Sequence, residues 1–170
     1  ELFFNDVKVP PENVLGQVDF GFYYLMQMLA QERLTNACCA IAGAKAAYDV
    51  TKTYVTERKA FGREIAKFQN TRFKMAEMKT EIDIGQVFVD RCVMDHNQQQ
   101  LKDDIAAEAK LWTTELLCKV VDQCVQLHGG AGYMWEYPIT RMYANARIQR
   151  IFAGTSEIMK EIIGRANGFA

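Results

Sequence analysis

Hydrophobic residues recur every three to four positions over most of the chain, which is the spacing of an amphipathic helix. From about Gly21 this pattern continues until Gly62 interrupts it, and it predicts a first long helix over this range. The apolar stripe of this helix consists of Leu34, Cys38, Ile41, Tyr48 and Val55.

Two further stripes with the same period predict two more long helices. One begins near Phe68 and ends near Asn97, and the other runs from about Asp103 to Gly129-Gly130, where glycine easily adopts the left-handed backbone of a helix C-cap. Their apolar positions are Met75, Met78, Ile82, Val89, Val93 and His96 in one helix, and Ile105, Ala109, Trp112, Leu116, Val120, Cys124 and Leu127 in the other.

Two shorter helices are predicted after the loop GGAGYMWEYP, over residues 139–148 and 156–166. Three helices of about 25 to 35 residues with short connections favour an antiparallel up-and-down arrangement. The predicted fold is therefore all-α, a four-helix-type bundle over residues 17–170 with short closing helices. The opening segment ELFFNDVKVP is rich in β-forming residues and is interpreted as an extended piece outside this bundle.

Composition and charge exclude several classes of protein. Hydrophobic residues make up 49% of the chain and charged residues 24%, which excludes an intrinsically disordered chain. The net charge is −1 and no run of basic residues is present, so we expect no nucleic-acid partner. Every uncharged stretch is shorter than the roughly 17 to 25 residues of a spanning helix, so no transmembrane segment is expected.

Cysteine and histidine positions indicate neither a disulfide framework nor a metal site. The five cysteines include no CxxC pair, and His96 and His128 are far apart in the sequence. We therefore expect a reducing compartment and no bound metal. Because the chain begins with Glu1 and not with Met, we expect a fragment or a processed product.

Five strings in order along the chain resemble the C-terminal domain of the acyl-CoA dehydrogenases. They are VPPENVLG, LAQERL, YVTERKAFGREIAKFQ, QLHGGAGYMWEYPITRMYANARI and FAGTSEI. The resemblance implies a flavoenzyme that oxidises a fatty acyl-CoA to the trans-2-enoyl-CoA, with FAD as cofactor and electron-transfer flavoprotein as the electron acceptor. It also implies that residues 1–16 are the tail strand and exit of a middle β domain that this chain lacks.

The family places its catalytic base in one of two positions. Most members carry it as Glu in the string EGT, but here Ala153 occupies that position, and a methyl group accepts no proton. The long-chain and isovaleryl-type branches place Glu before Arg in the first long helix, which matches Glu32 and Arg33. The resemblance therefore implies Glu32 as the base and Arg33 as a residue that positions the base or the thioester. Spacing alone would describe both as solvated helix residues.

An apolar cavity would raise the pKa of such a base toward neutrality, which suits the removal of a carbon-bound proton. Apolar residues near Glu32 in the sequence offer the wall of this cavity. They are Phe22, Leu25, Met26, Met28 and Leu29.

The resemblance also implies two sets of FAD contacts to the cofactor of a neighbouring subunit. Arg58, Phe61 and Gln69 match residues that reach its pyrophosphate and adenosine, and a planar guanidinium can hold two phosphate oxygens. Gln126 and Gly130 match contacts at the adenosine end. Without the resemblance, Arg58 would be an exposed charge and Phe61 a core residue. Shared contacts imply a homodimer or homotetramer, and we expect the bundle alone to be inactive.

Thr155 and Glu157 match contacts to the FAD of their own subunit. Many relatives have Gln at the position of Glu157, and a carboxylate cannot donate the hydrogen bonds of an amide. N-capping of the last helix is the alternative role of Thr155.

Two other functions remain open from the sequence. The protein could be an acyl-CoA oxidase-like flavoenzyme that uses molecular oxygen, or a non-catalytic helical interaction module, which the vacant Ala153 would support. The position of the base favours long-chain substrates. The bacterial cytoplasm and the mitochondrial matrix are both compatible with this reading.

Overall fold

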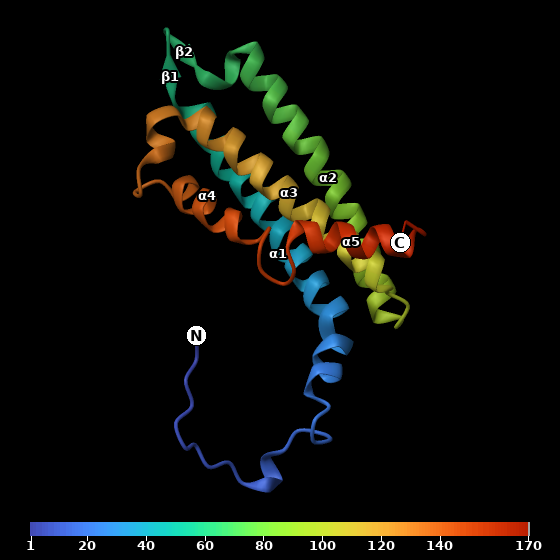
Figure 1. Cartoon of the computed structure of the whole chain (residues 1–170). Coiled ribbons are helices and arrows are strands. Elements are labelled where there is room, and N and C mark those ends of the chain that lie inside the picture. Colours follow the sequence, from blue (N-terminus) through green and yellow to red (C-terminus); the bar gives the residue numbers. More distant parts are fainter. Residues whose placement is uncertain (170) are drawn as a thin grey trace.

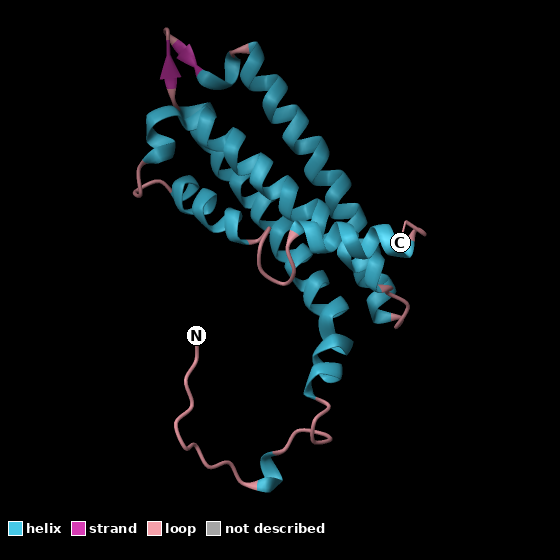
Figure 2. Ribbon diagram, in the orientation of Figure 1, coloured by secondary structure: helices cyan, strands magenta, loops and turns pink. Residues whose placement is uncertain are grey.

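Three long helices lie side by side in the computed structural model, which describes residues 1–169 (Figures 1 and 2). These are α1 (Gly21–Glu57), α2 (Gln69–Asn97) and α3 (Asp103–His128), and the shorter helices are α4 (Pro138–Ile148) and α5 (Ser156–Ala166). Single 3-10 turns occur at η1 (Pro11–Asn13), η2 (Ile65–Lys67) and η3 (Gly129–Tyr133). The predicted all-α bundle with short closing helices is confirmed.

Small side chains allow α1 and α3 to pack closely at the centre of the bundle. Four alanines of α1 and three of α3 are completely buried, and they alternate with the larger residues of the predicted stripes. The alanines are Ala37, Ala40, Ala44 and Ala47 of α1 and Ala106, Ala107 and Ala109 of α3. On α2, a Cβ atom at Gly85 would lie 2.9 Å from Cδ1 of Ile41, so the side chain of Ile41 packs directly against the backbone of α2 at this glycine.

The first long helix ends at Glu57, five residues before the predicted end. The chain then forms a small antiparallel hairpin of β1 (Lys59–Ala60) and β2 (Arg63–Glu64). Phe61 and Gly62 connect the strands with φ values of 53° and 77°. Two consecutive left-handed residues are typical of a type I′ turn, whose twist matches that of a hairpin. Periodicity missed this hairpin because each strand has only two residues.

The first 20 residues lie away from the bundle and are exposed (Figure 1). Within the described chain, residues 1–10 pair with no other strand. A strand here requires a partner from elsewhere, so the assignment of residues 1–16 to a middle β domain stays a prediction. Among the described helices, none is both long and apolar enough to cross a membrane.

His128 connects the ends of α1 and α3. Its side chain is buried, with Nδ1 2.8 Å from the carbonyl oxygen of Cys124. Its ring stacks on Tyr54 with 4.1 Å between the centroids, and the Tyr54 hydroxyl donates a hydrogen bond to the carbonyl of His128 at 3.2 Å. Burial lowers the pKa of His128. The sequence had indicated no partner for this histidine.

We expect His128 to make the stability of the bundle depend on pH. Because its pKa is lower in the folded state, the unfolded chain binds more protons as the pH falls below about 6.5, and stability is lost in that range. The free energy of unfolding of the variant His128→Gln should therefore change less between pH 7 and pH 5 than that of the wild type, whatever its value at pH 7. Urea unfolding at several pH values measures this slope. The half-buried His96 provides the control, and equal slopes for His96→Gln and His128→Gln would contradict the expectation.

Candidate functional site

One end of the bundle collects five of the predicted site residues. Arg58 is the C-cap residue of α1, and Phe61 lies at the tip of the hairpin that follows. Gln69 begins α2 at the same end. The contact between Tyr54 and His128 brings the end of α3 beside them, and with it Gln126 and Gly130 (Figure 1).

The surface at this end has the chemistry that a phosphate and a flat ring require. Arg58 is exposed and has no ion-pair partner among residues 1–169. Gln69 and Gln126 add exposed amides. A Cβ atom at Gly130 would meet nothing within 4 Å in the described chain, so the backbone there is open to close approach. These residues fit a dinucleotide cofactor, because they combine a guanidinium, amide donors and uncovered backbone.

Phe61 is 95% exposed, so its interpretation as a core residue is wrong. Its φ of 53° is in the left-handed region, which is rare for a bulky side chain. The ring meets that of Phe68 edge-on, with 6.3 Å between the centroids. An exposed aromatic side chain on strained backbone stabilises the fold little, which is typical of a residue kept for contact with another molecule.

A second region surrounds the turn between α4 and α5. Ala153 has φ 54° and Gly154 has φ 96°, so the turn contains two left-handed residues. Thr155 caps α5, because its hydroxyl accepts a hydrogen bond from the backbone N–H of Ile158 at 3.3 Å. The expected N-cap is confirmed.

Glu157 lies in the first turn of α5 and is exposed. Its own backbone N–H and the Thr155 hydroxyl hold the pKa of its carboxyl group below the usual value. This side chain is therefore a carboxylate at neutral pH and accepts hydrogen bonds without donating any.

Lys110 of α3 lies directly beneath this turn. Its side chain is completely buried, and its Nζ donates a hydrogen bond to the carbonyl oxygen of Gly154 at 2.7 Å. Burial lowers the pKa of Lys110, an effect that the charge of Glu115 opposes and that of Arg33 reinforces.

Lys110 is not among the candidate site residues predicted from the sequence, although the small residues around it on α3 indicate that it lies on an interior face. The neighbours three and four positions away are small and completely buried, which marks this face of α3 as an interior one. They are Ala106, Ala107, Thr113 and Thr114.

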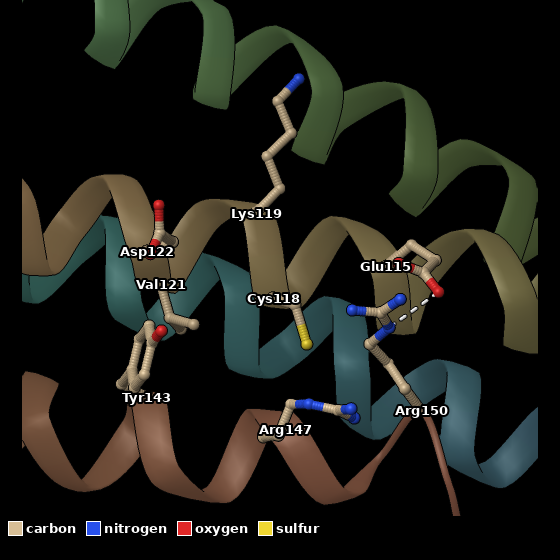
Figure 3. Close-up of a pocket in the computed structure, with 8 residues that line it drawn as sticks. All are labelled: Glu115, Cys118, Lys119, Val121, Asp122, Tyr143, Arg147 and Arg150. Carbon is tan, nitrogen blue, oxygen red and sulfur yellow. Dashed lines mark hydrogen bonds and ion pairs between the residues drawn. The ribbon is translucent and has the colours of Figure 1, made fainter. Parts of the chain in front are cut away.

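Glu115 holds both ends of the same turn. Its Oε1 accepts a hydrogen bond from the Ser156 hydroxyl at 2.7 Å and pairs with Nε of Arg150 at 2.8 Å. Figure 3 shows the latter pair at the border of a pocket of about 450 Å³ between α3 and α4. None of the candidate site residues predicted from the sequence lines this pocket. Glu115 therefore contributes to the site by anchoring the turn.

Arg33 of α1 is buried, whereas its neighbour Glu32 is exposed. Arg33 is 6% exposed, and its charge acts on Lys110. Its Nε has no hydrogen-bond partner among the described residues. Glu32 is exposed and forms no hydrogen bond or ion pair with any residue of the described chain. The buried guanidinium of Arg33 is thus near enough to Lys110 to lower its pKa, and Lys110 in turn bonds to the residue after Ala153.

The expected apolar wall around Glu32 is not closed within this chain. The start of α1 extends beyond α3 and α4, so no other helix covers it (Figure 1). Four of the five apolar residues are therefore 40% to 66% exposed. They are Phe22, Leu25, Met26 and Met28.

The two regions lie far apart on one chain. From residue 33 to residue 58, α1 spans about 37 Å at a rise of about 1.5 Å per residue. The structure therefore gathers Arg58, Phe61 and Gln126 at one end of the bundle and separates them from Arg33 near the start of α1.

Comparison with known proteins identifies the relatives of this chain. Residues 19–167 match the model of the family described as acyl-CoA dehydrogenase, C-terminal domain. The long-chain specific acyl-CoA dehydrogenase, mitochondrial, of Sus scrofa is 50% identical over 165 residues, which cover 97% of this chain and 38% of that protein. Caffeyl-CoA reductase-Etf complex subunit CarC of Acetobacterium woodii is 37% identical, over 96% of this chain and 43% of that protein.

A solved structure extends the likeness to three dimensions. The acyl-CoA dehydrogenase of Geobacillus kaustophilus has a TM-score of 0.94 and 45% sequence identity, over 98% of this chain and 44% of that one. The chain thus spans about two fifths of the length of the relatives that it matches.

Proposed function

Because this chain belongs to the acyl-CoA dehydrogenase family, we propose that the full-length protein oxidises fatty acyl-CoA thioesters to trans-2-enoyl-CoA with FAD. The observation that carries the proposal is the match of residues 19–167 to the family's C-terminal domain, in a chain that has a carboxylate at Glu32 and none at Ala153. Of the family's two alternative positions for the base, only Glu32 supplies a carboxylate in this chain.

We propose a role for each of Glu32, Arg33, Thr155 and Glu157. The carboxylate of Glu32 removes the α-proton of the thioester, and the buried Arg33 positions the base or the thioester end. Thr155 contacts the flavin of its own subunit, while Glu157 can offer only an acceptor. The chemistry that FAD supplies when bound is the acceptance of a hydride from the β-carbon. Further domains of the full-length protein would cover the exposed start of α1 and close the apolar wall.

The separation of the two regions supports a flavin site shared between subunits. Arg58, Phe61, Gln69, Gln126 and Gly130 would hold the pyrophosphate and adenosine of the FAD bound to a neighbouring copy. Because these residues lie far from Thr155 along the bundle, each copy would contribute one set of contacts to its own FAD and a second set to the FAD of its neighbour. We therefore propose a homodimer or a homotetramer, with the bundle inactive when isolated.

Electron-transfer flavoprotein is the proposed electron acceptor. The relative from Acetobacterium woodii carries an Etf complex in its name, which supports this choice. A long-chain acyl-CoA is the favoured substrate, in agreement with the name of the relative from Sus scrofa. The mitochondrial matrix and the bacterial cytoplasm are the proposed compartments, since the relatives come from mitochondria and from bacteria.

The full-length protein tests this function directly. We expect it to purify with the absorption of bound flavin and to lose that absorption when an acyl-CoA is added without oxygen. A series of acyl-CoA lengths then defines the substrate. Faster turnover with oxygen than with electron-transfer flavoprotein would identify an oxidase instead, and a colourless protein that does not bind FAD would identify a non-catalytic module.

Phe61 offers a test in which stability and flavin binding change in opposite directions. Asparagine tolerates the left-handed backbone better than phenylalanine, so Phe61→Asn should stabilise the chain by up to about 1 kcal/mol. The same variant of the full-length protein should retain less FAD, because the exposed ring is lost. Urea unfolding and the flavin content after gel filtration measure the two effects. Undiminished flavin content in the variant would show that Phe61 has no part in binding.

A further inference from the structure

The buried ammonium of Lys110 is a feature that the proposed chemistry leaves without a role. It is completely buried, and the carbonyl of Gly154 is its one hydrogen-bond partner among the described residues. Placing an ammonium group in the interior with a single acceptor is unfavourable, and a neutral side chain of similar length would fill the same space without this penalty. The ammonium group of Lys110 therefore has a role other than packing.

The geometry of the peptide between Gly154 and Thr155 shows what this bond controls. The described chain contains no cis peptide, and the C=O and N–H of a planar trans peptide point in opposite directions. Because Lys110 holds the oxygen of Gly154, the N–H of Thr155 is directed away from Lys110. That N–H has no acceptor within residues 1–169. A charge-assisted bond at the oxygen also polarises the peptide and strengthens this donor.

The turn needs such a restraint because its backbone is strained. Ala153 adopts a left-handed conformation that residues with a side chain seldom occupy. Glu115 holds the two ends of the turn through Arg150 and Ser156, but neither of these contacts reaches its centre. Lys110 is the side chain that bonds to the middle of the turn.

We propose that Lys110 is a positioning residue for the flavin contact at Thr155, which it orients by holding the carbonyl of Gly154. Lys110 does not touch the flavin itself, since it lies on the opposite side of the peptide. This inference rests on the proposed function, because Thr155 is a flavin contact only in that reading. It adds a residue from the middle of α3 to the part of the site around Thr155.

The variant Lys110→Met of the full-length protein tests the inference. We expect its dissociation constant for FAD to rise about tenfold, because the Thr155 N–H is no longer held in place and its hydrogen bond to the flavin is weakened. In flavin-free protein, amide hydrogens of residues 150–156 should exchange faster than in the wild type, while those in the middle of α3 should not. Lys119→Met is the matched control, because Lys119 lies on the same helix but pairs with Glu81 at the surface.

A second control separates orientation from packing. Thr114 lies one turn after Lys110, is completely buried and bonds only to its own helix. If Thr114→Val weakens FAD binding as much as Lys110→Met does, packing explains the effect and the inference is wrong. Wild-type affinity and unchanged exchange in Lys110→Met would also overturn it. Should Lys110→Met not fold, Lys110→Gln replaces it under the same criteria.

The two proposals can fail separately. If the wild-type full-length protein binds no FAD, the proposed function is refuted. The exchange comparison needs no flavin, and unchanged exchange in the turn would refute the restraint by Lys110 even if the wild type proves to be a flavoenzyme.

Discussion

In the full-length protein, Glu32→Gln should abolish the acyl-CoA-dependent loss of flavin absorption while leaving the flavin bound. Gln has nearly the shape of Glu but cannot accept the α-proton, and Ala153 supplies no second carboxylate. General bases contribute about 10²- to 10⁴-fold to a rate, and we expect a loss in the upper part of this range because carbon-bound protons are weakly acidic. Rapid mixing with an acyl-CoA in the absence of oxygen measures the rate of flavin reduction.

Glu32 suits this test because the fold does not depend on it. It is exposed and makes no hydrogen bond or ion pair with the described residues, so stability should change by less than about 0.5 kcal/mol. The exposed Glu77 of α2 provides a control in which the same substitution should leave the rate unchanged. Undiminished flavin reduction in Glu32→Gln would assign the base to another residue.

Arg58→Ala should weaken FAD binding about 10- to 100-fold, the range expected for hydrogen bonds between charged groups. Arg58 has no ion-pair partner in the described chain, so its removal should act on the cofactor and not on the bundle. Titration of flavin-free full-length protein with FAD measures the dissociation constant.

Two variants separate the geometry of Arg58 from its charge. Arg58→Lys keeps the charge but loses the planar pair of donors, so its affinity should lie between those of wild type and Arg58→Ala. Lys59 is exposed on the first strand of the hairpin, and Lys59→Ala should bind FAD normally. Equal losses in Lys59→Ala and Arg58→Ala would mean that only the overall positive charge of the hairpin matters.

The long helices could be predicted because their signal is local. Leu34, Ile41 and Val55 recur with the helical period and are all buried in the structure. Gly129 ends α3 as predicted and has a φ of 60°, but its ψ of −139° differs from the left-handed C-cap that was expected. The hairpin escaped prediction because its strands have only two residues each and its turn requires a positive φ at Phe61, which phenylalanine rarely adopts.

The candidate site could be predicted only where a motif is continuous in the sequence. Glu32–Arg33, Arg58 and Thr155 each lie within a short string that resembles the family, so they could be selected without coordinates. The role of Lys110 depends on a bond to Gly154, 44 residues further along the chain, and no local pattern encodes that contact.

By itself the sequence determined the helical class, the helix positions and the family-like residues, because hydrophobic period, helix caps and short motifs act between near neighbours. The tertiary structure decided which of these residues meet. It placed Arg58 and Gln126 at the same end of the bundle through the stacking of Tyr54 on His128, and it bonded Lys110 to the turn before Thr155. It also left the start of α1 uncovered. Such contacts depend on how whole helices pack, since the burial of a side chain is a property of all the elements around it.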